Sequence, residues 1–591
     1  MAKAIYSNHS LPIGTLIDNI KLGRTGLPDL QRPFVWKDNK VRDLLDSMIN
    51  GFPIGYVILW NSPEDYENAK TIGINEKAYK RPLNLVIDGQ QRLTSLIGAF
   101  EGILVKDKNY KERHIKISFH PLDRKFEVWD MSTERNQEWI SDISKIFMAD
   151  DEHKMPSFRK AYIKNLNESR SKKGEESLND EQEELIESRL NEVLDLRKYS
   201  IPTIEIFATA TEEQVAEIFK RVNSGGQKLN ENNFIETLLS VYDNDVYQLM
   251  DKFCSDSRIQ KDGTSYNHII ELDTSRLIRM VVGVGFHRAR MQYAYKILRG
   301  QDLQTRKYSE ETRTESLKIF KEALNKVVNL NDWHAFLNLF PRAGYVKGEH
   351  ISSSYVVVFT YVLYLIGKYE YKVNVNTLEA LLTRWIFMAT ITSFYTNSSE
   401  STVERQMADL RDISTANDFV AYLEKTIEQR MTDDFFNVTL IQDLTNAAAI
   451  SPAWYGYVAS LNIIGTQLLF SNVVQGQMLT VGSNGKKKAL DKHHIFPKHY
   501  LEELGITDNR VRNQIANFTY LHYQTNIEIG DKAPAEYIKD FKTRLGEEAF
   551  AKTCSENALP EGFENMEYLE FLEKRRKLMS DIIRKAYERL Q

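Results

Sequence analysis

The motif that most constrains this chain lies close to its C-terminal end. Residues 491–497 read Asp-Lys-His-His-Ile-Phe-Pro, Asn517 follows inside an apolar stretch, and Asn526 lies nine residues further on. Two adjacent histidines alone are usually ordinary polar residues at a strand end. The proline and the two spaced asparagines instead favour a small strand-strand-helix hairpin that brings imidazoles and amides together.

These residue types suit the hydrolysis of a phosphodiester, which needs a base to activate water and a cation to neutralise the phosphate. We expect His494 to be the general base, because imidazole titrates near neutral pH. His493 and Asn526 are expected to hold one divalent ion, Mg²⁺ or Mn²⁺. Asn517 is expected on the second strand, with its amide bonded to the loop that carries the histidines, so that His494 keeps one orientation.

The motif resembles that of the HNH, or His-Me finger, nucleases in the form with asparagine at the last position. The first position in that family is often aspartate, whereas this chain has His493. Asp491 therefore stays open as a substitute metal ligand, and His499 and His522 also lie close in sequence. No cysteine pairs flank the motif, which excludes a zinc-ribbon scaffold.

The composition is that of an ordinary globular chain of several domains, with 591 residues, 42% hydrophobic and 27% charged. Only two cysteines, far apart, favour a reducing cytoplasm over a disulfide framework. The N-terminus has no apolar core typical of a signal peptide. The apolar stretch 355–366 is too short to span a bilayer, so it predicts a buried helix and no membrane partner.

A net charge of −5 gives no global attraction to nucleic acid, so a DNA-binding surface has to be local. Lysines gather around the histidine motif, where they would neutralise phosphates beside the scissile bond of double-stranded DNA. Adjacent lysines also occur as a solvated loop, and that alternative stays open. The candidate DNA contacts are Lys486, Lys487, Lys488, Lys492 and Lys498.

The front of the chain has a mixed α/β pattern. Alternating or apolar runs predict strands, and one amphipathic stretch predicts a helix. Residues 83–96 predict a buried strand that breaks at Asp88-Gly89 and passes into a helix. Such a junction points backbone N–H groups at an anion, and Arg92 could form bidentate hydrogen bonds to a phosphate. The expected strands are 56–60, 83–87, 114–119 and 125–129, and the expected helix is 41–49.

Three segments together resemble the ParB-like nucleotide-binding domain of the GmrSD family of modification-dependent (type IV) restriction enzymes. They hold a Gln31-Arg32 pair, an Asp-Gly-Gln-Gln-Arg core at 88–92 and a polar turn at 223–226. Residues 384–400 also look like the helical region of that family. The resemblance implies an NTP whose base is unknown, since no P-loop is present. It assigns nucleotide binding to Gln31, Arg32, Asp88, Gly89, Gln90, Gln91, Arg92 and Asn223.

We therefore expect a multidomain α+β protein in three parts. The parts are a ParB-like α/β N-terminal domain at 1–240 with a helical insertion at about 150–198, an α-helical middle domain at 241–480, and a ββα-metal (HNH) endonuclease domain with C-terminal helices at 481–591. Residues 480–485 have the small polar composition of a linker.

Two further features of the chain bear on this scheme. Residues 165–197 are dense in charge and predict a solvated loop with one helix. An aromatic set at helical spacing favours helix packing, while a pocket for a flipped base stays open. The set is Tyr355, Phe359, Tyr361, Trp385, Phe387 and Tyr395.

The leading hypothesis is a cytoplasmic, nucleotide-regulated endonuclease that restricts phage DNA carrying hydroxymethylated or glucosylated cytosine. A second hypothesis, from the same resemblance, is a phosphorothioate-sensing NTPase that nicks DNA. A third is a nucleotide-dependent DNA-binding adaptor with an inactive nuclease fold, which the complete histidine and asparagine set argues against. The number of subunits stays open, a homodimer included.

Overall fold

The computed structural model describes residues 4–27, 36–61, 82–107, 111–223, 235, 239, 244–396, 399–447, 450–479 and 490–591. The chain is a mixed α/β protein with two compact units, Met1–Ser255 and Asp256–Gln591. Each unit is described by itself below.

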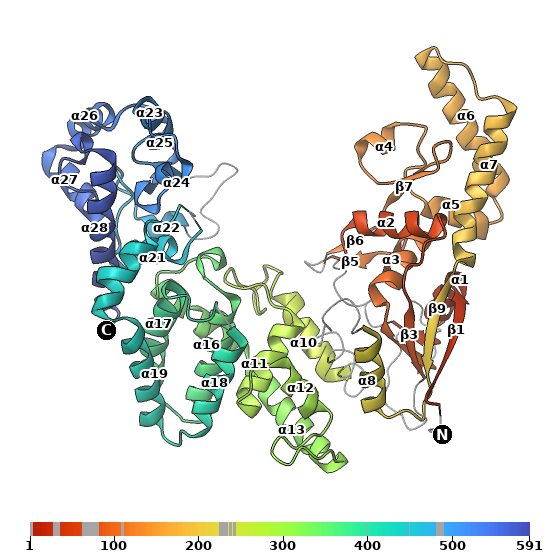
Figure 1. The fold of residues 1–591 in the computed structure, drawn as a ribbon, viewed down its shortest axis with the longest axis horizontal. Helices are drawn as coiled ribbons and strands as arrows, with labels where there is room; N and C mark the ends of the chain where they lie inside the picture. The colour runs from red at the N-terminus through yellow and green to blue at the C-terminus, as the bar shows by residue number, and fades with distance from the viewer. Residues whose placement is uncertain are drawn as a thin grey trace. The chain divides into compact units, whose positions relative to one another are not determined.

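The first unit is built on a five-stranded sheet (Figure 1). Its strand order is β1-β9-β3-β4-β2, in which β9 runs antiparallel to β1 and parallel to β3, and β4 runs antiparallel to β3 and parallel to β2. The strands are β1 (Tyr6–Pro12), β2 (Thr25–Gly26), β3 (Val57–Asn61), β4 (Asn84–Asp88) and β9 (Ser200–Ile206).

Helices of the first unit bury apolar faces against this sheet and against one another. Their side chains, with those of β3 and β4, form one hydrophobic core that includes Leu16, Leu45, Leu93 and Phe100. The helices that supply this core include α1 (Ile13–Lys21), α2 (Asp38–Ile49), α3 (Gln90–Glu101) and α5 (Ser144–Asp151), and α8 (Glu212–Asn223) follows β9 along the chain.

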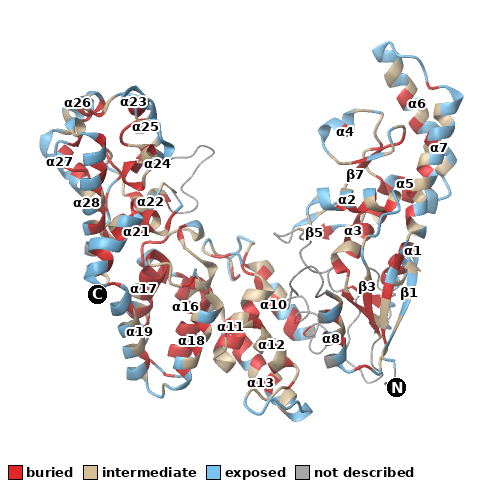
Figure 2. Cartoon of the chain, viewed as in Figure 1, coloured by how far each residue is buried: buried red, intermediate tan, exposed pale blue. Residues whose placement is uncertain are grey.

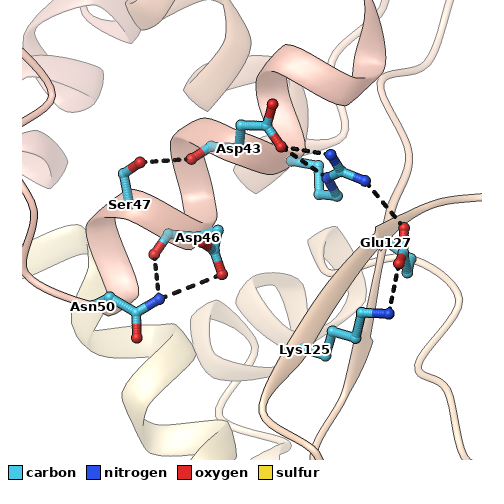
Figure 3. Close-up of polar contacts among 7 residues, drawn as sticks. Asp43, Asp46, Ser47, Asn50, Lys125 and Glu127 are labelled. Carbon is cyan, nitrogen blue, oxygen red and sulfur yellow. Dashed lines mark hydrogen bonds and ion pairs between the residues drawn. The ribbon is translucent and has the colours of Figure 1, made fainter.

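A short hairpin, β7 (Ile117–His120) with β8 (Lys125–Val128), lies against α2. Arg42 on α2 bonds Glu127 at 3.3 Å, and Lys125 reaches the same carboxylate at 2.8 Å (Figure 3). The strands predicted at 56–60, 83–87 and 125–129 and the helix at 41–49 are all present, while the strand predicted at 114–119 begins at Ile117.

The charged segment 165–197 differs from its prediction. It holds the C-terminal half of α6 (Met155–Lys173) and all of α7 (Asp180–Leu194), so that it contributes to two helices rather than to one (Figure 1). Charged residues such as Glu, Lys and Arg are good helix formers, and Leu166 is buried as the apolar anchor of this stretch. Helix α6 is capped at its C-terminal end by Gly174, whose φ of +75° suits a left-handed C-cap.

The second unit is mainly helical. The central helix α16 (Ser354–Tyr369) is buried along almost its whole length (Figure 2). Within the described part of the chain, no helix is both long and apolar enough to cross a bilayer. Before residue 480, the other long helices of this unit are α11 (Thr274–Phe286), α13 (Glu310–Val327), α17 (Val375–Ile391), α18 (Ser399–Arg411), α19 (Ala416–Arg430) and α21 (Pro452–Ile464).

The aromatic set of this region belongs to the helix packing. Phe359, Tyr361, Trp385, Phe387 and Tyr395 are all fully buried, which leaves their rings no face for a base. Rings on neighbouring helices touch instead, as where Phe359 and Tyr395 approach to 6.3 Å between centroids. The packing interpretation therefore holds for these five residues.

The C-terminal segment packs directly on the helical middle. The last helix, α28 (Tyr568–Arg589), lies along α21, and Ser580 on it donates to the carbonyl of Phe436 at 2.7 Å. The backbone N–H of Ile515 donates to the carbonyl of Asn446 at 2.9 Å. The two regions thus form one compact unit, while the expected linker at 480–485 lies outside the described residues.

Candidate active site

The histidine motif forms a two-stranded hairpin followed by a helix. Strand β10 (Leu490–His494) pairs antiparallel with β11 (Phe518–His522), so that His494 lies opposite Phe518. Helix α25 (Tyr523–Ile529) begins directly after β11 and contacts both strands. Alternation along β10 puts Asp491 and His493 on one face, and Lys492 and His494 on the other.

Asn517 fixes the turn that follows the histidines. It is fully buried as the last residue of a short 3₁₀ helix, immediately before β11. Its Oδ1 accepts from the N–H of Phe496 at 2.8 Å, and its Nδ2 donates to the carbonyls of Phe496 and Arg512, each at 3.1 Å. The amide therefore holds the backbone two residues after His494.

His494 is held by a second asparagine that the sequence did not single out. Its Nε2 donates to Oδ1 of Asn513 at 2.9 Å, so Nδ1 is the nitrogen left to accept a proton. The ring also packs on Phe518, with 4.5 Å between centroids. Burial lowers the pKa of His494 below its ordinary value, and the nearby cations Lys498 and Lys492 act in the same direction. The imidazole is thus neutral near pH 7, as a base must be.

On the other face of β10, three polar side chains meet. Asn526 on α25 donates from Nδ2 to Oδ2 of Asp491 at 3.0 Å. Nε2 of His493 is buried without a hydrogen-bond partner. Burial lowers the pKa of His493 to about 4, against the opposing effect of its contact with Asn526. A neutral imidazole with an unused buried nitrogen is suited to bind a metal ion.

Asp491 and Asn526 carry side-chain oxygens of the kind that Mg²⁺ and Mn²⁺ prefer, and His493 carries one imidazole nitrogen beside them. The described residues hold no cluster of three or more His, Cys, Asp or Glu side chains arranged around one metal position. Mg²⁺ is commonly bound by one or two protein ligands together with waters and substrate phosphates. His499 and His522 do not join the set, because His499 faces Glu503 at 3.4 Å and His522 caps α25.

Of the five candidate DNA-binding lysines, two are described. Lys492 is exposed, and its ammonium lies 4.9 Å from the centre of the Phe518 ring, on the face of His494. Lys498 is exposed at the start of α23 (Lys498–Glu503). Both cations therefore lie near His494. Lys486, Lys487 and Lys488 lie outside the described residues.

Arg575 is the second residue that sequence reasoning missed. It is fully buried on α28, and its Nη1 donates to the carbonyls of Ala516 at 2.6 Å and Phe518 at 2.8 Å. These carbonyls bracket Asn517, so the last helix holds the start of β11. The spacing of Phe571, Arg575 and Met579 would have placed this arginine on the apolar face of α28.

In the first unit, Asp88 ends β4 and Arg92 lies in the first turn of α3. Arg92 donates to the carbonyl of Ile54 at 2.7 Å and approaches Asp88 to 3.5 Å. Its guanidinium also lies 5.9 Å from the Tyr56 ring centre. Burial raises the pKa of Asp88, an effect that Arg92 partly offsets. The pair thus forms a partly buried carboxylate-guanidinium site where β3 and β4 lie side by side.

Two glycines shape this junction. Gly89 has a φ of +92° and lets the chain turn from β4 into α3. Gly55 has a φ of +93°, and a Cβ there would lie 2.2 Å from Nη1 of Arg92. The backbone at Gly55 therefore comes close to the guanidinium only because this residue has no side chain.

The other candidate nucleotide contacts are spread over the first unit. Gln90 is buried, and its amide donates to the carbonyl of Val86 at 2.7 Å, so it braces the turn. Gln91 is the second residue of α3, next to Arg92. Asn223 is the last residue of α8. Gln31 and Arg32 lie outside the described residues.

Comparison with known proteins addresses the first unit most directly. Residues 13–240 match the family described as "GmrSD restriction endonuclease, N-terminal domain". Over that range the first unit is therefore similar to the N-terminal domain of GmrSD restriction endonucleases.

The chain is also similar to the "Uncharacterized protein MJ0686" of Methanocaldococcus jannaschii. The two are 22% identical over 565 residues, which cover 89% of this chain and 86% of the relative. The similarity therefore extends through both units, beyond the residues of the family match.

Proposed function

We propose that this chain is a nucleotide-regulated, divalent-metal-dependent HNH endonuclease that restricts modified phage DNA in the cytoplasm of a prokaryote. The observation that carries the proposal is the geometry around His494. A neutral imidazole at a strand end is bonded to Asn513, and Asn517 fixes the turn beside it. The family match of the first unit independently supports restriction of DNA.

In this proposal His494 takes a proton from the attacking water at Nδ1. Asn513 keeps the proton on Nε2 and holds the ring in one orientation. A general base placed in this way contributes roughly 10²- to 10⁴-fold to the rate. Asn517 contributes indirectly, because it holds the backbone on which His494 is carried.

His493 would hold a divalent cation, together with Asn526 or Asp491. When bound, the cation would supply a positive charge for the phosphate and the leaving oxygen. The unused Nε2 of His493 supports this role. The bond between Asn526 and Asp491 keeps two oxygen-bearing side chains beside it. Lys492 and Lys498 would bind phosphates next to the scissile bond.

The NTP would bind at the junction of Asp88 and Arg92. The helix start after Gly89 offers backbone N–H groups, and Arg92 offers a cation. A bound nucleotide would change the access of the nuclease to DNA, for which a coupling of about 1 to 3 kcal/mol is ordinary. Such control would protect the host chromosome from an active nuclease.

The test measures how the full-length protein cleaves four matched DNAs, which are unmodified, hydroxymethylated, glucosylated or phosphorothioated. Each is incubated with Mg²⁺ or Mn²⁺, with and without each NTP. We expect cutting confined to DNA with modified cytosine and altered by one nucleotide. Nucleotide turnover stimulated only by phosphorothioate DNA, with nicking, would replace this function with that of a backbone-modification sensor.

Absence of cutting on every substrate would contradict the nuclease assignment and favour a DNA-binding adaptor. To separate that outcome from inactive protein, NTP binding is measured on the same sample. Retained NTP binding without cutting would identify a folded protein that has no nuclease activity.

A further inference from the structure

The second unit contains a cavity of about 390 Å³ that the chemistry above does not use. This volume is within the range of small-molecule sites. Apolar walls come from Ile391, Phe435 and Pro452, and polar groups come from Arg430, Thr439 and Asp443. The lining therefore offers apolar surface for a flat ring and a carboxylate that can receive a hydrogen bond from the edge of that ring.

One wall of this cavity has an uncommon backbone. Residues Phe435–Thr439 form a single stretch of π-helix, followed directly by the short helix Leu440–Asp443. Such insertions are rare and occur frequently at functional sites. Here the π-helix supplies Phe435 and Thr439 to the cavity, and Asp443 follows on the next turn.

Two exposed apolar side chains adjoin the lining residues. Ile450 is 78% exposed, more than any other large apolar side chain in the described ranges, and it directly precedes the lining residue Ser451. Val438 is 63% exposed and directly precedes Thr439. Proteins that unstack DNA insert such apolar side chains between base steps.

The cavity is linked to the candidate active site through the backbone. Asn446 lines the cavity, and its carbonyl accepts from Ile515, two residues before Asn517. In addition, Trp454 of α21 packs on Phe518 of β11, with 6.3 Å between ring centroids. A DNA strand bound at His494 would thus lie in the same compact unit as the cavity.

We propose that this cavity receives a base turned out of the DNA, with Ile450 inserted into the gap that the base leaves. The proposal rests on the proposed function for its DNA substrate. Enzymes that act on or inspect a base commonly extrude it into a pocket, at a cost that is lowest for an unpaired base. The occupant is a base with an exocyclic amine, such as cytosine and unlike thymine, because that amine can donate to the carboxylate of Asp443.

The test is DNA binding by the full chain in EDTA, so that no cleavage occurs. Three labelled duplexes are compared, which hold one cytosine opposite an abasic site, one thymine opposite an abasic site, or full pairing. We expect the unpaired-cytosine duplex to bind about tenfold more tightly than the unpaired-thymine duplex. It should also bind more tightly than the paired duplex.

Two variants separate the cavity from general DNA affinity. Asp443→Asn should abolish the preference for cytosine over thymine, and Thr439→Trp should remove it by filling the cavity. The matched control is Asp434→Asn, an exposed carboxylate of the same segment that is not among the lining residues. Ile450→Ala should weaken binding of the paired duplex more than that of the unpaired-cytosine duplex.

Equal binding of the three duplexes, or a cytosine preference that survives Asp443→Asn and Thr439→Trp, would overturn the proposal. Absence of binding to every duplex would overturn it as well. A preference for cytosine without any cutting in Mg²⁺ or Mn²⁺ would support the proposed role of the cavity and refute the nuclease assignment. Cutting without the preference for cytosine would support the nuclease and refute the proposed role of the cavity.

Discussion

The side-chain amide of Asn517 pairs with both backbone groups of Phe496, accepting from its N–H at 2.8 Å and donating to its carbonyl at 3.1 Å. Phe496 lies two residues after His494, and Asn517 is fully buried. The buried amide therefore acts as a clamp on the turn that leaves β10.

Asn517→Ala should lower both stability and cleavage. The change leaves the N–H and carbonyl of Phe496 without partners in a buried place, which costs about 2 to 4 kcal/mol in the free energy of unfolding. Urea unfolding and a plasmid-nicking assay measure the two effects. The control is Asn565→Ala, at an exposed asparagine of the same unit. Equal stability of the two variants would show that the clamp is not needed.

Asn513→Ala should slow the cutting step and leave DNA affinity near normal. The bond from His494 to Asn513 orients the ring, and the loss of such a partner typically costs 10- to 100-fold in activity. Asn513→Asp keeps an acceptor for Nε2 and should retain most of the rate. Single-turnover cleavage and DNA binding in EDTA measure the two quantities. A similar loss in both variants would mean that orientation by an acceptor is not the role of Asn513.

Gly55→Ala should disturb the candidate nucleotide site through Arg92. The added methyl would lie 2.2 Å from Nη1 of Arg92, so the guanidinium must move. Gly51→Ala is the matched control, because Gly51 also has a positive φ, +72°, but nothing lies within 4 Å of its Cβ. Both variants share the backbone strain, and only Gly55→Ala should weaken NTP binding, by about tenfold or 1.4 kcal/mol. Titration calorimetry with each NTP measures the two affinities. Equal NTP affinity of the two variants would contradict the assignment of the nucleotide site.

Much of the site was predictable because its residues are close in sequence. The hairpin follows from the apolar run around Asn517 and from the proline after the histidines, and the turn at Gly89 follows from a strand that breaks at Asp-Gly. Such features depend on local backbone preferences, which a single sequence contains.

Other parts depend on contacts between distant segments. Asn513 resembles any polar loop residue, and only the packing of β10 brings it to His494. Arg575 reaches the carbonyl of Phe518, at the start of β11, from 57 residues away along the chain. The charged stretch of α6 was mistaken for a loop because charge alone does not distinguish a solvated helix from a solvated loop, and Leu166 was its only strong apolar anchor.

His350 should make the second unit lose stability as the pH falls. It is 2% exposed and stacks on Tyr455, and burial, aided by Lys347, lowers its pKa to about 4. In the unfolded chain the imidazole of His350 binds a proton below about pH 6.5, whereas in the folded chain it binds one only below about pH 4. Stability is therefore retained above pH 6.5 and falls by about 3 kcal/mol towards pH 4.

The variant His350→Phe keeps a ring beside Tyr455 and removes the proton-binding group. Urea unfolding at pH 7 and pH 4.5 should show a smaller acid loss in His350→Phe than in the unchanged protein. His499→Phe, at an exposed histidine, serves as control and should keep the full loss. Identical acid losses in all three proteins would contradict the assignment to His350.

The most direct test of the central claim compares His494→Ala with His499→Ala in metal-dependent cleavage. Both remove an imidazole from the same segment, but only His494 is bonded to Asn513 beside the Asn517 clamp, whereas His499 is exposed. On the DNA that the unchanged protein cuts with Mg²⁺ or Mn²⁺, His494→Ala should lose at least about 10²-fold in rate while it still binds DNA and NTP. His499→Ala should cut normally. Cleavage retained by His494→Ala protein that is free of contaminating nucleases would contradict the claim that His494 is the general base.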